Sequence, residues 1–232
     1  MKIALNRREI GYTYGSTSGT YSFRSQKSVQ FESLLEKQFL TTLEFNDMVL
    51  DVISQPLIID YITQKGNKST YRPDFLVFFK DTNNIRKPPM KPLLVEVKPS
   101  KKLIKHKDEL KLKFKATMRF CNEVDYRFKI FNENRIESNQ LKNIIFLNRY
   151  KDFRIDLDYI EIIKNHLLAV GHTTIEHLLT HLYVTDLQKS IALSHIWFLL
   201  YNKAISTNLN MLLNNNTVIW LNIEEDNLGV EI

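Results

Sequence analysis

The sequence predicts an α/β domain followed by a small, mainly helical domain. Residues 72–79 and 93–99 contain two apolar runs rich in Val, Leu and Phe, each bounded by Pro or polar residues, as core strands are. From residue 31 to about residue 150 the predicted order is helix, three strands, helix, strand, helix and strand, which indicates an α/β core. After Arg149 the composition changes to three amphipathic helical stretches and two short strand-like ones.

The first 30 residues show little periodicity. Gly, Ser, Thr and Tyr are frequent here, and tyrosines are interleaved with the basic residues Arg7, Arg8, Arg24 and Lys27. Two interpretations are open: a loosely ordered basic arm, or an arm that lies along nucleic acid with its aromatic side chains packed or stacked on it.

A helix is predicted from Phe31 to Leu43, because apolar residues recur there at helical spacing. Glu36 lies close to the apolar stripe, whereas Glu32 faces solvent. Ser33-x-x-Glu36 also matches a helix capping box, although a helix that begins at Phe31 places Ser33 inside it. The residues leave open whether Glu36 caps the helix or reaches a site on the sheet.

The middle of the chain predicts a strand, a turn and a proline-rich loop. The strand covers residues 55–62, with Pro56 at its start, where a missing N–H is tolerated. Residues 65–68 form a turn around Gly66. Residues 80–92 contain three prolines and form a polar loop between the two apolar runs.

The stretch from Lys107 to Glu123 fits both a strand and a helix, and its length favours a helix. Further strands are predicted for residues 126–131 and 143–147, separated by a brief helix near residues 138–142. These elements complete an α/β core whose central strands carry carboxylates.

The last third of the chain predicts three helices and two strands. The helices span residues 157–170, ending at Gly171, residues 175–182, capped by Thr173-x-x-Glu176, and residues 187–203, capped by Thr185-x-x-Gln188. Residues 205–207 and 217–221 are strand-like, with asparagine turn residues between them. Three helices followed by a two-stranded hairpin indicate a winged helix-turn-helix.

This winged-helix domain has few of the charges that DNA binding needs. Its third helix carries only Lys189, His195 and Lys203, which favours a protein contact over DNA binding. His177 and His181 lie four residues apart and could share a metal ion. No Cys or carboxylate at ligand spacing completes that set, so we interpret the pair as a polar helix face.

Charge is unevenly distributed along the 232 residues, whose net charge is +6. Between Lys98 and Arg119 there are nine Lys or Arg residues against two acids, while the last nine residues hold four acids and no base. The basic segment fits either a polyanionic substrate or a solvated helix face. The candidate DNA contacts are the four lysines that follow the second apolar run, Lys101, Lys102, Lys105 and Lys107.

The remaining composition is that of a globular protein, with 44% apolar and 25% charged residues. The single cysteine, Cys121, excludes an internal disulfide framework and is expected to be a packed core thiol. No apolar run reaches the length of about 18 residues that a membrane span needs. The N-terminus lacks the apolar segment of a signal peptide, and we expect a cytoplasmic protein.

Three residues of the two apolar runs form a candidate catalytic site. Asp74 opens the first strand, Glu96 lies inside the second, and Lys98 shares a strand face with Glu96. If the strands are neighbours, the three side chains converge at the sheet edge. Two carboxylates beside a lysine can hold a divalent cation and a water for attack on phosphate. The alternative is a salt bridge on an edge strand.

Four motifs together resemble TnsA, the endonuclease subunit of heteromeric cut-and-paste transposases. They are Ser33-Leu34-Leu35-Glu36, Gln55-Pro56, Arg72-Pro73-Asp74-Phe75 and Glu96-Val97-Lys98-Pro99. The motifs span about residues 25–150, and the rest of the chain resembles the family in domain order alone. Glu-x-Lys after an Asp is common to many nucleases, whereas the combination with Ser-x-x-Glu, Gln-Pro and a trailing winged helix is more specific. Some TnsA proteins have an amide at the position of Glu96.

The resemblance implies a restriction-endonuclease-like domain at residues 31–150, after a basic arm at 1–30, and a winged-helix domain with an acidic tail at 151–232. It implies Mg²⁺-dependent cleavage, with Mn²⁺ as a substitute, of the 5′-ended strand at transposon ends. The family's acidic residues correspond to Glu36, Asp74 and Glu96 and its lysine to Lys98, with the Val97 carbonyl as a further possible metal ligand. The expected setting is the prokaryotic nucleoid.

The resemblance also implies partners: a TnsB-like DDE transposase that cuts the other strand, a TnsC-like AAA+ ATPase, and the double-stranded DNA of the transposon ends. Two alternatives remain from the residues themselves. One is a stand-alone restriction or repair nuclease with the same core, which cuts DNA without partners. The other is a non-catalytic winged-helix adaptor, which an intact Asp-Glu-Lys set disfavours.

Overall fold

The computed structural model describes residues 17–81 and 89–222. The chain divides into two compact units, Met1–Glu137 and Ser138–Ile232, so the division comes earlier than the predicted boundary at residue 150. Arg7, Arg8, most of the loop at residues 80–92 and the acidic C-terminal tail lie outside the described residues. Within the described ranges, none of the helices combines the length and apolar character that crossing a membrane requires.

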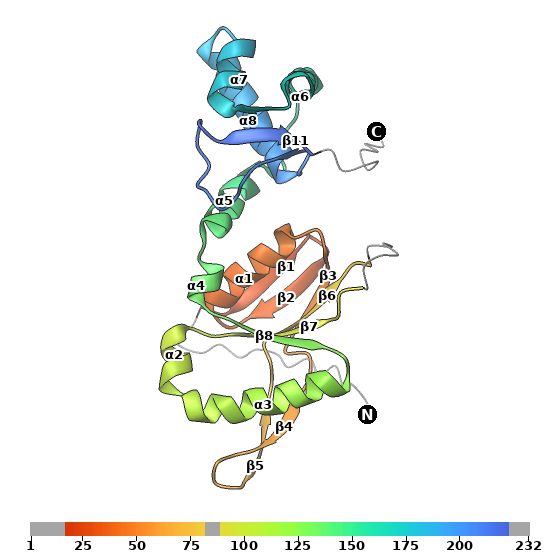
Figure 1. The fold of residues 1–232 in the computed structure, drawn as a ribbon, viewed down its shortest axis with the longest axis vertical. Coiled ribbons are helices and arrows are strands. Elements are labelled where there is room, and N and C mark those ends of the chain that lie inside the picture. Colours follow the sequence, from red (N-terminus) through yellow and green to blue (C-terminus); the bar gives the residue numbers. More distant parts are fainter. Residues whose placement is uncertain (1–16, 82–88, 223–232) are drawn as a thin grey trace. The chain divides into compact units, whose positions relative to one another are not determined.

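A four-stranded sheet forms the centre of the N-terminal unit (Figure 1). Its order is β3 (Val49–Ser54), β6 (Phe75–Phe79), β7 (Leu93–Val97) and β8 (Arg127–Phe131). The first two pairs are antiparallel, and β7 pairs with β8 in parallel. The two apolar runs are therefore neighbouring strands, as predicted. Every residue of β7 is buried, which explains its continuous apolar sequence.

The strand predicted at residues 55–62 is wrong in its first half. The preceding segment forms β3, which was not predicted, and Gln55 leaves it with a φ of 44°. Pro56 then lacks the N–H that would continue the ladder. Only Ile59–Ile62 is a strand (β4). It pairs with β5 (Lys68–Tyr71) in a separate hairpin around the predicted turn at Gly66.

Helix α1 (Leu34–Phe45) begins three residues later than predicted. Ser33 is its N-cap and accepts a hydrogen bond from the Glu36 N–H at 3.2 Å, so the residues before it are not helical. Phe31 instead ends β2 (Lys27–Phe31), which pairs with β1 (Gly19–Phe23). The second half of the predicted loose arm is thus an ordered hairpin.

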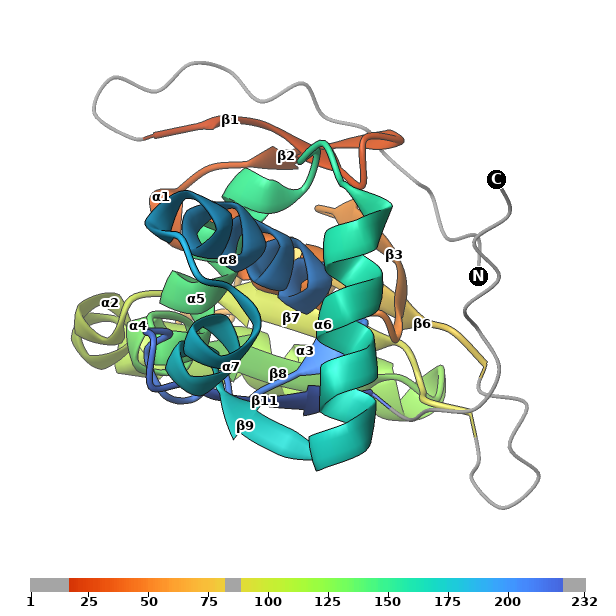
Figure 2. The same ribbon diagram turned by 90° about the horizontal axis from the view of Figure 1, so that it is seen from above.

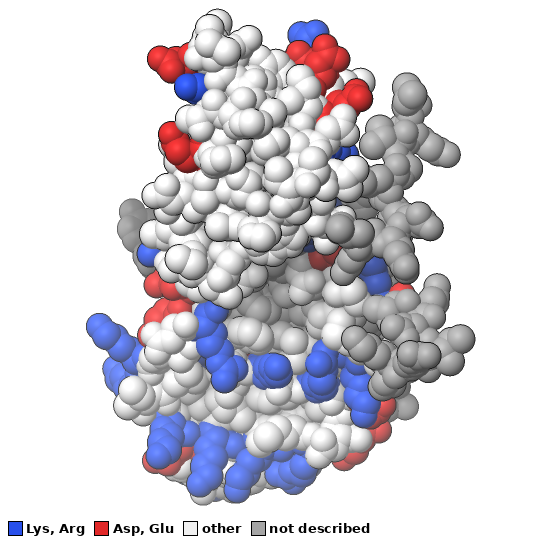
Figure 3. Space-filling view, turned by 45° about the horizontal axis from the view of Figure 1, so that its top comes forward, with Lys and Arg blue, Asp and Glu red and all other residues white. Residues whose placement is uncertain are grey.

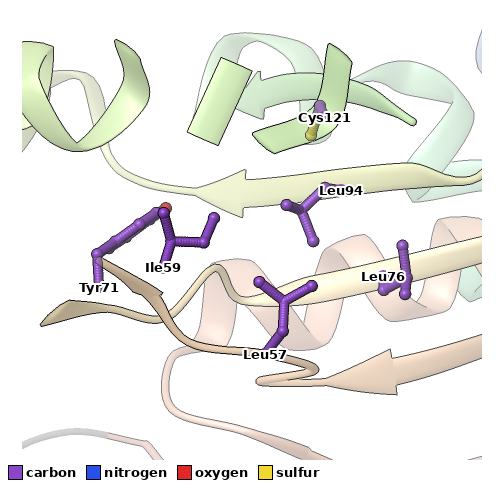
Figure 4. Packing of buried hydrophobic residues seen from close by; sticks show 6 residues of the cluster. All are labelled: Leu57, Ile59, Tyr71, Leu76, Leu94 and Cys121. Carbon is purple, nitrogen blue, oxygen red and sulfur yellow. The ribbon is translucent and has the colours of Figure 1, made fainter. Parts of the chain in front are cut away.

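Two helices cover opposite faces of the sheet (Figure 1). On one face, Phe39 of α1 packs against Phe75 and Phe131, with ring centroids 5.9 and 4.8 Å apart. On the other face lies α3 (Lys107–Glu123), the helix that the length of this segment favoured, preceded by α2 (Ser100–Lys105). Figure 4 shows the core of this second face, formed by Leu57, Ile59, Tyr71, Leu76, Leu94 and Cys121.

The strand predicted at residues 143–147 is wrong. After α4 (Glu133–Ile136), residues Asn139–Leu147 form the helix α5, followed by a 3-10 turn, η1 (Asn148–Tyr150). Ser138 caps α5, and Leu141, Ile144 and Leu147 are buried at a spacing of three, which one helix face explains better than a strand. This helix belongs to the C-terminal unit.

The three helices predicted for the C-terminal unit are confirmed (Figures 1 and 2). They are α6 (Leu157–Val170), α7 (Ile175–Leu182) and α8 (Asp186–Tyr201). Gly171 ends α6 with a φ of 77°, a conformation that glycine adopts easily, and Thr185 and Gln188 form the predicted capping box.

The strands of this unit differ in number from the prediction. β10 (Ile205–Ser206) and β11 (Val218–Leu221) pair as expected, and β9 (His172–Thr174) adds a third strand beside β11. Because Thr173 lies within β9, Thr174 rather than Thr173 caps α7, accepting a hydrogen bond from the His177 N–H at 3.2 Å.

Candidate active site

The antiparallel register of β6 and β7 brings two carboxylates together. Phe75 lies opposite Val95, so Asp74, one residue before β6, lies opposite Glu96 on the same face of the sheet. Lys98, one residue after β7, shares that face. The convergence of these three residues, inferred from strand periodicity, is the arrangement in the structure.

Glu96 is fully buried on a central strand and has two hydrogen-bond partners. The Tyr71 hydroxyl donates to one carboxylate oxygen and the Lys98 ammonium to the other. A buried carboxylate needs such partners, because it has lost its hydration. Burial and the neighbouring Glu96 both raise the pKa of Tyr71, so its hydroxyl remains a donor. The salt bridge proposed as an alternative therefore exists, but on a central strand and beside Asp74.

Asp74 accepts a hydrogen bond from the Val97 N–H at 2.6 Å. Burial raises its pKa well above the ordinary value, and the negative charges of Glu96 and Glu36 add to the increase. Lys98 and the Val97 N–H act in the opposite direction without offsetting it. Asp74 therefore resists ionisation in the folded chain, because its surroundings do not compensate a further negative charge.

Glu36 lies in the first turn of α1, next to the N-cap Ser33, and also faces this cluster. Its carboxylate accepts hydrogen bonds from the Glu32 N–H at 2.7 Å and the Ser33 hydroxyl at 2.8 Å. Its pKa is raised, mainly by burial and further by Glu32 and Glu96. Glu32 is exposed and accepts a hydrogen bond from the Gln55 amide at 2.8 Å. Of the two glutamates, Glu36 is therefore the buried one beside Glu96.

The charge state of Lys98 follows from opposing effects. Burial lowers the pKa of its ammonium, but the attraction of Glu96, Asp74 and Glu36 outweighs burial, so the pKa is raised. Lys98 is accordingly a protonated donor at neutral pH. This suits it to orienting a water or offsetting phosphate charge rather than to removing a proton.

Two residues that support the carboxylates were not among the site residues predicted from the sequence. Tyr71 holds Glu96, and the Gln55 N–H donates to the Asp74 carbonyl at 2.8 Å while the Gln55 amide holds Glu32. Gln55 belongs to a motif of the family resemblance, which was the only signal for it. Tyr71 gave no signal, because its contact with Glu96 depends on the β4–β5 hairpin.

The donor set of the site can be compared with what a divalent cation needs. As the side chains stand, no three His, Cys, Asp or Glu residues in the described part of the chain are gathered as a metal ion requires. Both oxygens of Glu96 are occupied by Tyr71 and Lys98. The atoms of the site that could bind a metal ion are nevertheless all carboxylate or carbonyl oxygens, which Mg²⁺ and Mn²⁺ prefer as ligands. Burial, and after it the repulsion between neighbouring carboxylates, raises the pKa values of Asp74 and Glu36. A cation would relieve that repulsion, so the residues fit it in kind and in charge.

The other candidates of the sequence analysis lie apart from this cluster. Lys101, Lys102, Lys105 and Lys107 are exposed on α2 and at the start of α3, directly after Lys98. Cys121 is a buried core thiol whose pKa burial raises to about 11. The rings of His177 and His181 stack at 5.9 Å on exposed positions, with His166 5.2 Å from His181.

Two family models match the chain. The model described as TnsA-like endonuclease N terminal matches residues 46–133, and the one described as TnsA endonuclease C terminal matches residues 136–209. The chain belongs to the TnsA family. The first match contains Asp74, Glu96 and Lys98, and the two matches meet close to the division between the two structural units. A search among curated proteins finds no match to the chain.

Proposed function

We propose that this TnsA-family chain is the metal-dependent DNA endonuclease of a heteromeric transposase, cutting the 5′-ended strand at transposon ends. The observation that supports this most directly is the cluster of Asp74, Glu96 and Lys98 across the β6–β7 pair. Two carboxylates beside a single protonated lysine suit the hydrolysis of a phosphodiester. The same cluster disfavours a non-catalytic adaptor.

Asp74, Glu96, Glu36 and the Val97 carbonyl would hold Mg²⁺, or Mn²⁺ in its place. When bound, the cation supplies Lewis-acid activation of the phosphate and of the attacking water. Glu96 would hold the cation through the oxygen that Lys98 occupies in the structure, and the Lys98 ammonium would then face the substrate. Lys98 then orients the water and offsets charge on the phosphate, while Tyr71 keeps Glu96 in place.

The DNA would lie over α2 and the start of α3. The four lysines there are exposed, and α2 buries none of its side chains, so they are available to phosphates. Because the chain runs directly from Lys98 into α2, these contacts would place the scissile strand at the carboxylates.

We further propose that the C-terminal unit is a winged helix that docks protein. Its order of α6, β9, α7, α8, β10 and β11 supports the fold. His195 is buried and its ring accepts from the Asp156 N–H at 2.9 Å, so it is unavailable to DNA. Near the start of α8, Val184 and Leu187 are 90% and 72% exposed. An apolar, weakly charged surface fits a TnsC-like ATPase or a TnsB-like transposase better than DNA.

The mechanism is tested by separating metal binding from cleavage. Asp74→Ala and Glu96→Ala should lose both, because each removes a carboxylate ligand. Lys98→Ala should keep the metal bound, since a repelling cation is gone, and should lose most strand cleavage. Calorimetric titration with Mg²⁺ and a nicking assay with the partner proteins measure the two properties.

Glu32→Ala is the matched control and should keep both properties, because Glu32 is exposed and bound to Gln55. Near-normal nicking by Lys98→Ala, or loss of its metal affinity, would contradict the mechanism. Strong cutting by the wild-type chain without partners would instead indicate a stand-alone nuclease.

A further inference from the structure

A groove of about 540 Å³ lies between α3 and β8 of the N-terminal unit, and none of the four proposed catalytic side chains lines it. Its floor is apolar and is formed mainly by Leu103, Leu110, Phe114, Met118, Phe128 and Ile130. Its charged lining consists of Lys107, Lys111, Lys115 and Lys129, with no carboxylate among the lining residues. The groove thus combines an apolar floor with a border of one charge sign.

The floor is built from packed side chains, yet part of it is open to solvent. Phe114 packs against Phe128 and Tyr71, with ring centroids 5.7 and 6.5 Å apart, which holds the ring in place. Met118 is 46% exposed. A preformed apolar surface of this kind is stabilised when an apolar partner covers it.

The lysines favour a partner with negative charge. Figure 3 shows Lys and Arg side chains gathered on the N-terminal unit. Glu109, an acidic residue of α3, pairs with Lys113 rather than with a lysine of the groove. The groove lysines therefore attract carboxylates or phosphates that approach from outside.

The β8 strand adds backbone donors and acceptors along one side of the groove. It is the last strand in the order of the described sheet. The Arg127 N–H bonds Pro92 and the Phe131 carbonyl accepts from Lys98, so alternate residues of β8 face β7. The backbone groups of Phe128 and Ile130 consequently face away from β7. The Ile130 carbonyl accepts from the Arg135 guanidinium at 3.4 Å, so an extended segment could pair with the Phe128 groups and the Ile130 N–H.

We propose that the α3–β8 groove is a docking site for an acidic, amphipathic segment of a partner protein. Its apolar side chains cover Met118 and the floor, and its carboxylates pair with Lys111, Lys115 and Lys129. DNA is the competing occupant, but phosphates would meet the lysines and leave the apolar floor uncovered. This binding goes beyond the proposed nuclease function and does not depend on the carboxylate cluster.

The test uses the full chain and a labelled synthetic peptide in which Leu alternates with Glu. Fluorescence anisotropy should show binding that weakens with salt, whereas the counterpart peptide with Lys in place of Glu should not bind. Met118→Glu and the double variant Lys111→Glu/Lys115→Glu should each weaken binding at least about tenfold, as removal of a central contact does. All three positions are exposed, so the fold should be retained.

Matched controls come from the β4–β5 hairpin, where Ile62, Lys65 and Lys68 are also exposed. Ile62→Glu and Lys65→Glu/Lys68→Glu make the same changes of charge and should keep the wild-type affinity. Thermal unfolding of all variants checks that they are folded. No binding of the acidic peptide, or equal binding by groove and control variants, would overturn the proposal.

Two further measurements separate the competing occupants. If Met118→Glu and the lysine variant lose affinity for double-stranded DNA while peptide binding is unchanged, the groove belongs to the DNA surface and the proposal is wrong. If sedimentation shows concentration-dependent self-association that Met118→Glu abolishes, a second copy of this chain is the occupant instead. Unchanged DNA affinity and a monomeric chain, with the expected peptide results, support the proposal.

Discussion

At the scale of single residues, the site depends on how a buried carboxylate is compensated. Glu96 has no exposed surface, and its two partners, Tyr71 and Lys98, come from different parts of the chain. Removing one partner of a buried charge costs more than removing both, because the remaining group has no water to replace it. The supporting residues of such a site are therefore open to test by stability as well as by activity.

Tyr71→Phe keeps the ring that packs on Phe114 and removes only the hydroxyl that donates to Glu96. The free energy of unfolding, measured by urea denaturation without metal, should fall by about 1–3 kcal/mol, because a buried acceptor is left without its donor. Tyr126→Phe, at a ring that packs edge-on against Phe120, is the control and should change stability little. An unchanged stability in Tyr71→Phe would show that the hydroxyl does not support Glu96.

Asp74→Asn should stabilise the metal-free protein while abolishing cleavage. The folded-state pKa of Asp74 is raised above 3.8, so the unfolded chain loses this proton first and stability falls as pH rises from about 4. Asparagine can accept the same Val97 hydrogen bond without the charge. The gain at pH 7 should be about 0.5–2 kcal/mol, the usual range of a single stabilising substitution.

The pH dependence distinguishes this effect from a change in packing. The stability difference between Asp74→Asn and wild type should grow between pH 4 and pH 7. It should no longer change with pH well below pH 3.8, where the aspartate is protonated in both states. Thermal unfolding across this range measures it, with the exposed Asp60→Asn as the control. A difference that is constant with pH would contradict the assigned cause.

At the scale of elements, the first turn of α1 places Glu36. Ser33 accepts from the Glu36 N–H and donates its hydroxyl to the Glu36 carboxylate, so the cap and the candidate site share a residue. Without the Ser33 hydroxyl, the helix loses its cap and the carboxylate loses one of its two donors. The stability of this helix end and the geometry of the site are therefore linked.

Ser33→Ala should lower the free energy of unfolding by about 1 kcal/mol, the usual cost of losing an N-cap. It should also slow nicking, because Glu36 is less firmly held. Ser138→Ala is the matched control: Ser138 caps α5 through the Leu141 N–H and lies away from the carboxylates. It should lower stability by a similar amount and leave nicking unchanged in the assay with partner proteins. Equal nicking rates in the two variants would show that the Ser33 cap does not influence the site.

At the scale of the whole molecule, net charge is concentrated where the substrate would bind. The proposed DNA surface carries Lys101, Lys102, Lys105 and Lys107, all of which are exposed. Binding of lysine to phosphate releases counterions, so the number of neutralised phosphates determines how steeply DNA affinity falls with salt. The salt dependence therefore gives the number of neutralised phosphates even when the DNA sequence of the binding site is not known.

Changing all four lysines to Ala should weaken DNA binding. It should also make the slope of log affinity against log salt less steep by up to about 3.6, which is about 0.9 for each phosphate that is no longer neutralised. Anisotropy titrations at several salt concentrations measure the slope. A control with the exposed Lys65, Lys68, Lys80 and Lys142 changed to Ala has the same net charge and should keep more of the slope. Equal slopes in both variants would mean that the first four lysines are only a solvated face.

Much of the local structure was determined by sequence alone. Apolar runs with Pro at their ends identified β6 and β7, and their period of two placed Glu96 and Lys98 on one face. Gly171 and the Thr185 capping box marked the limits of α6 and α8 because these signals act within a few residues. The pairing of Asp74 with Glu96 could also be predicted, since it needed only that two successive strands be neighbours.

Only the tertiary structure decided features that depend on contacts between distant segments. β3 was not predicted, and α5 was mistaken for a strand. A short apolar stretch fits the period of a helix as well as that of a strand, and only its packing partners select one of the two. That Glu36 is buried near Glu96 while Glu32 is exposed depends on where Ser33 starts the helix and on Gln55 holding Glu32. Tyr71 reaches Glu96 only because the β4–β5 hairpin folds beside β7, and a contact made by folding leaves no local pattern in the sequence.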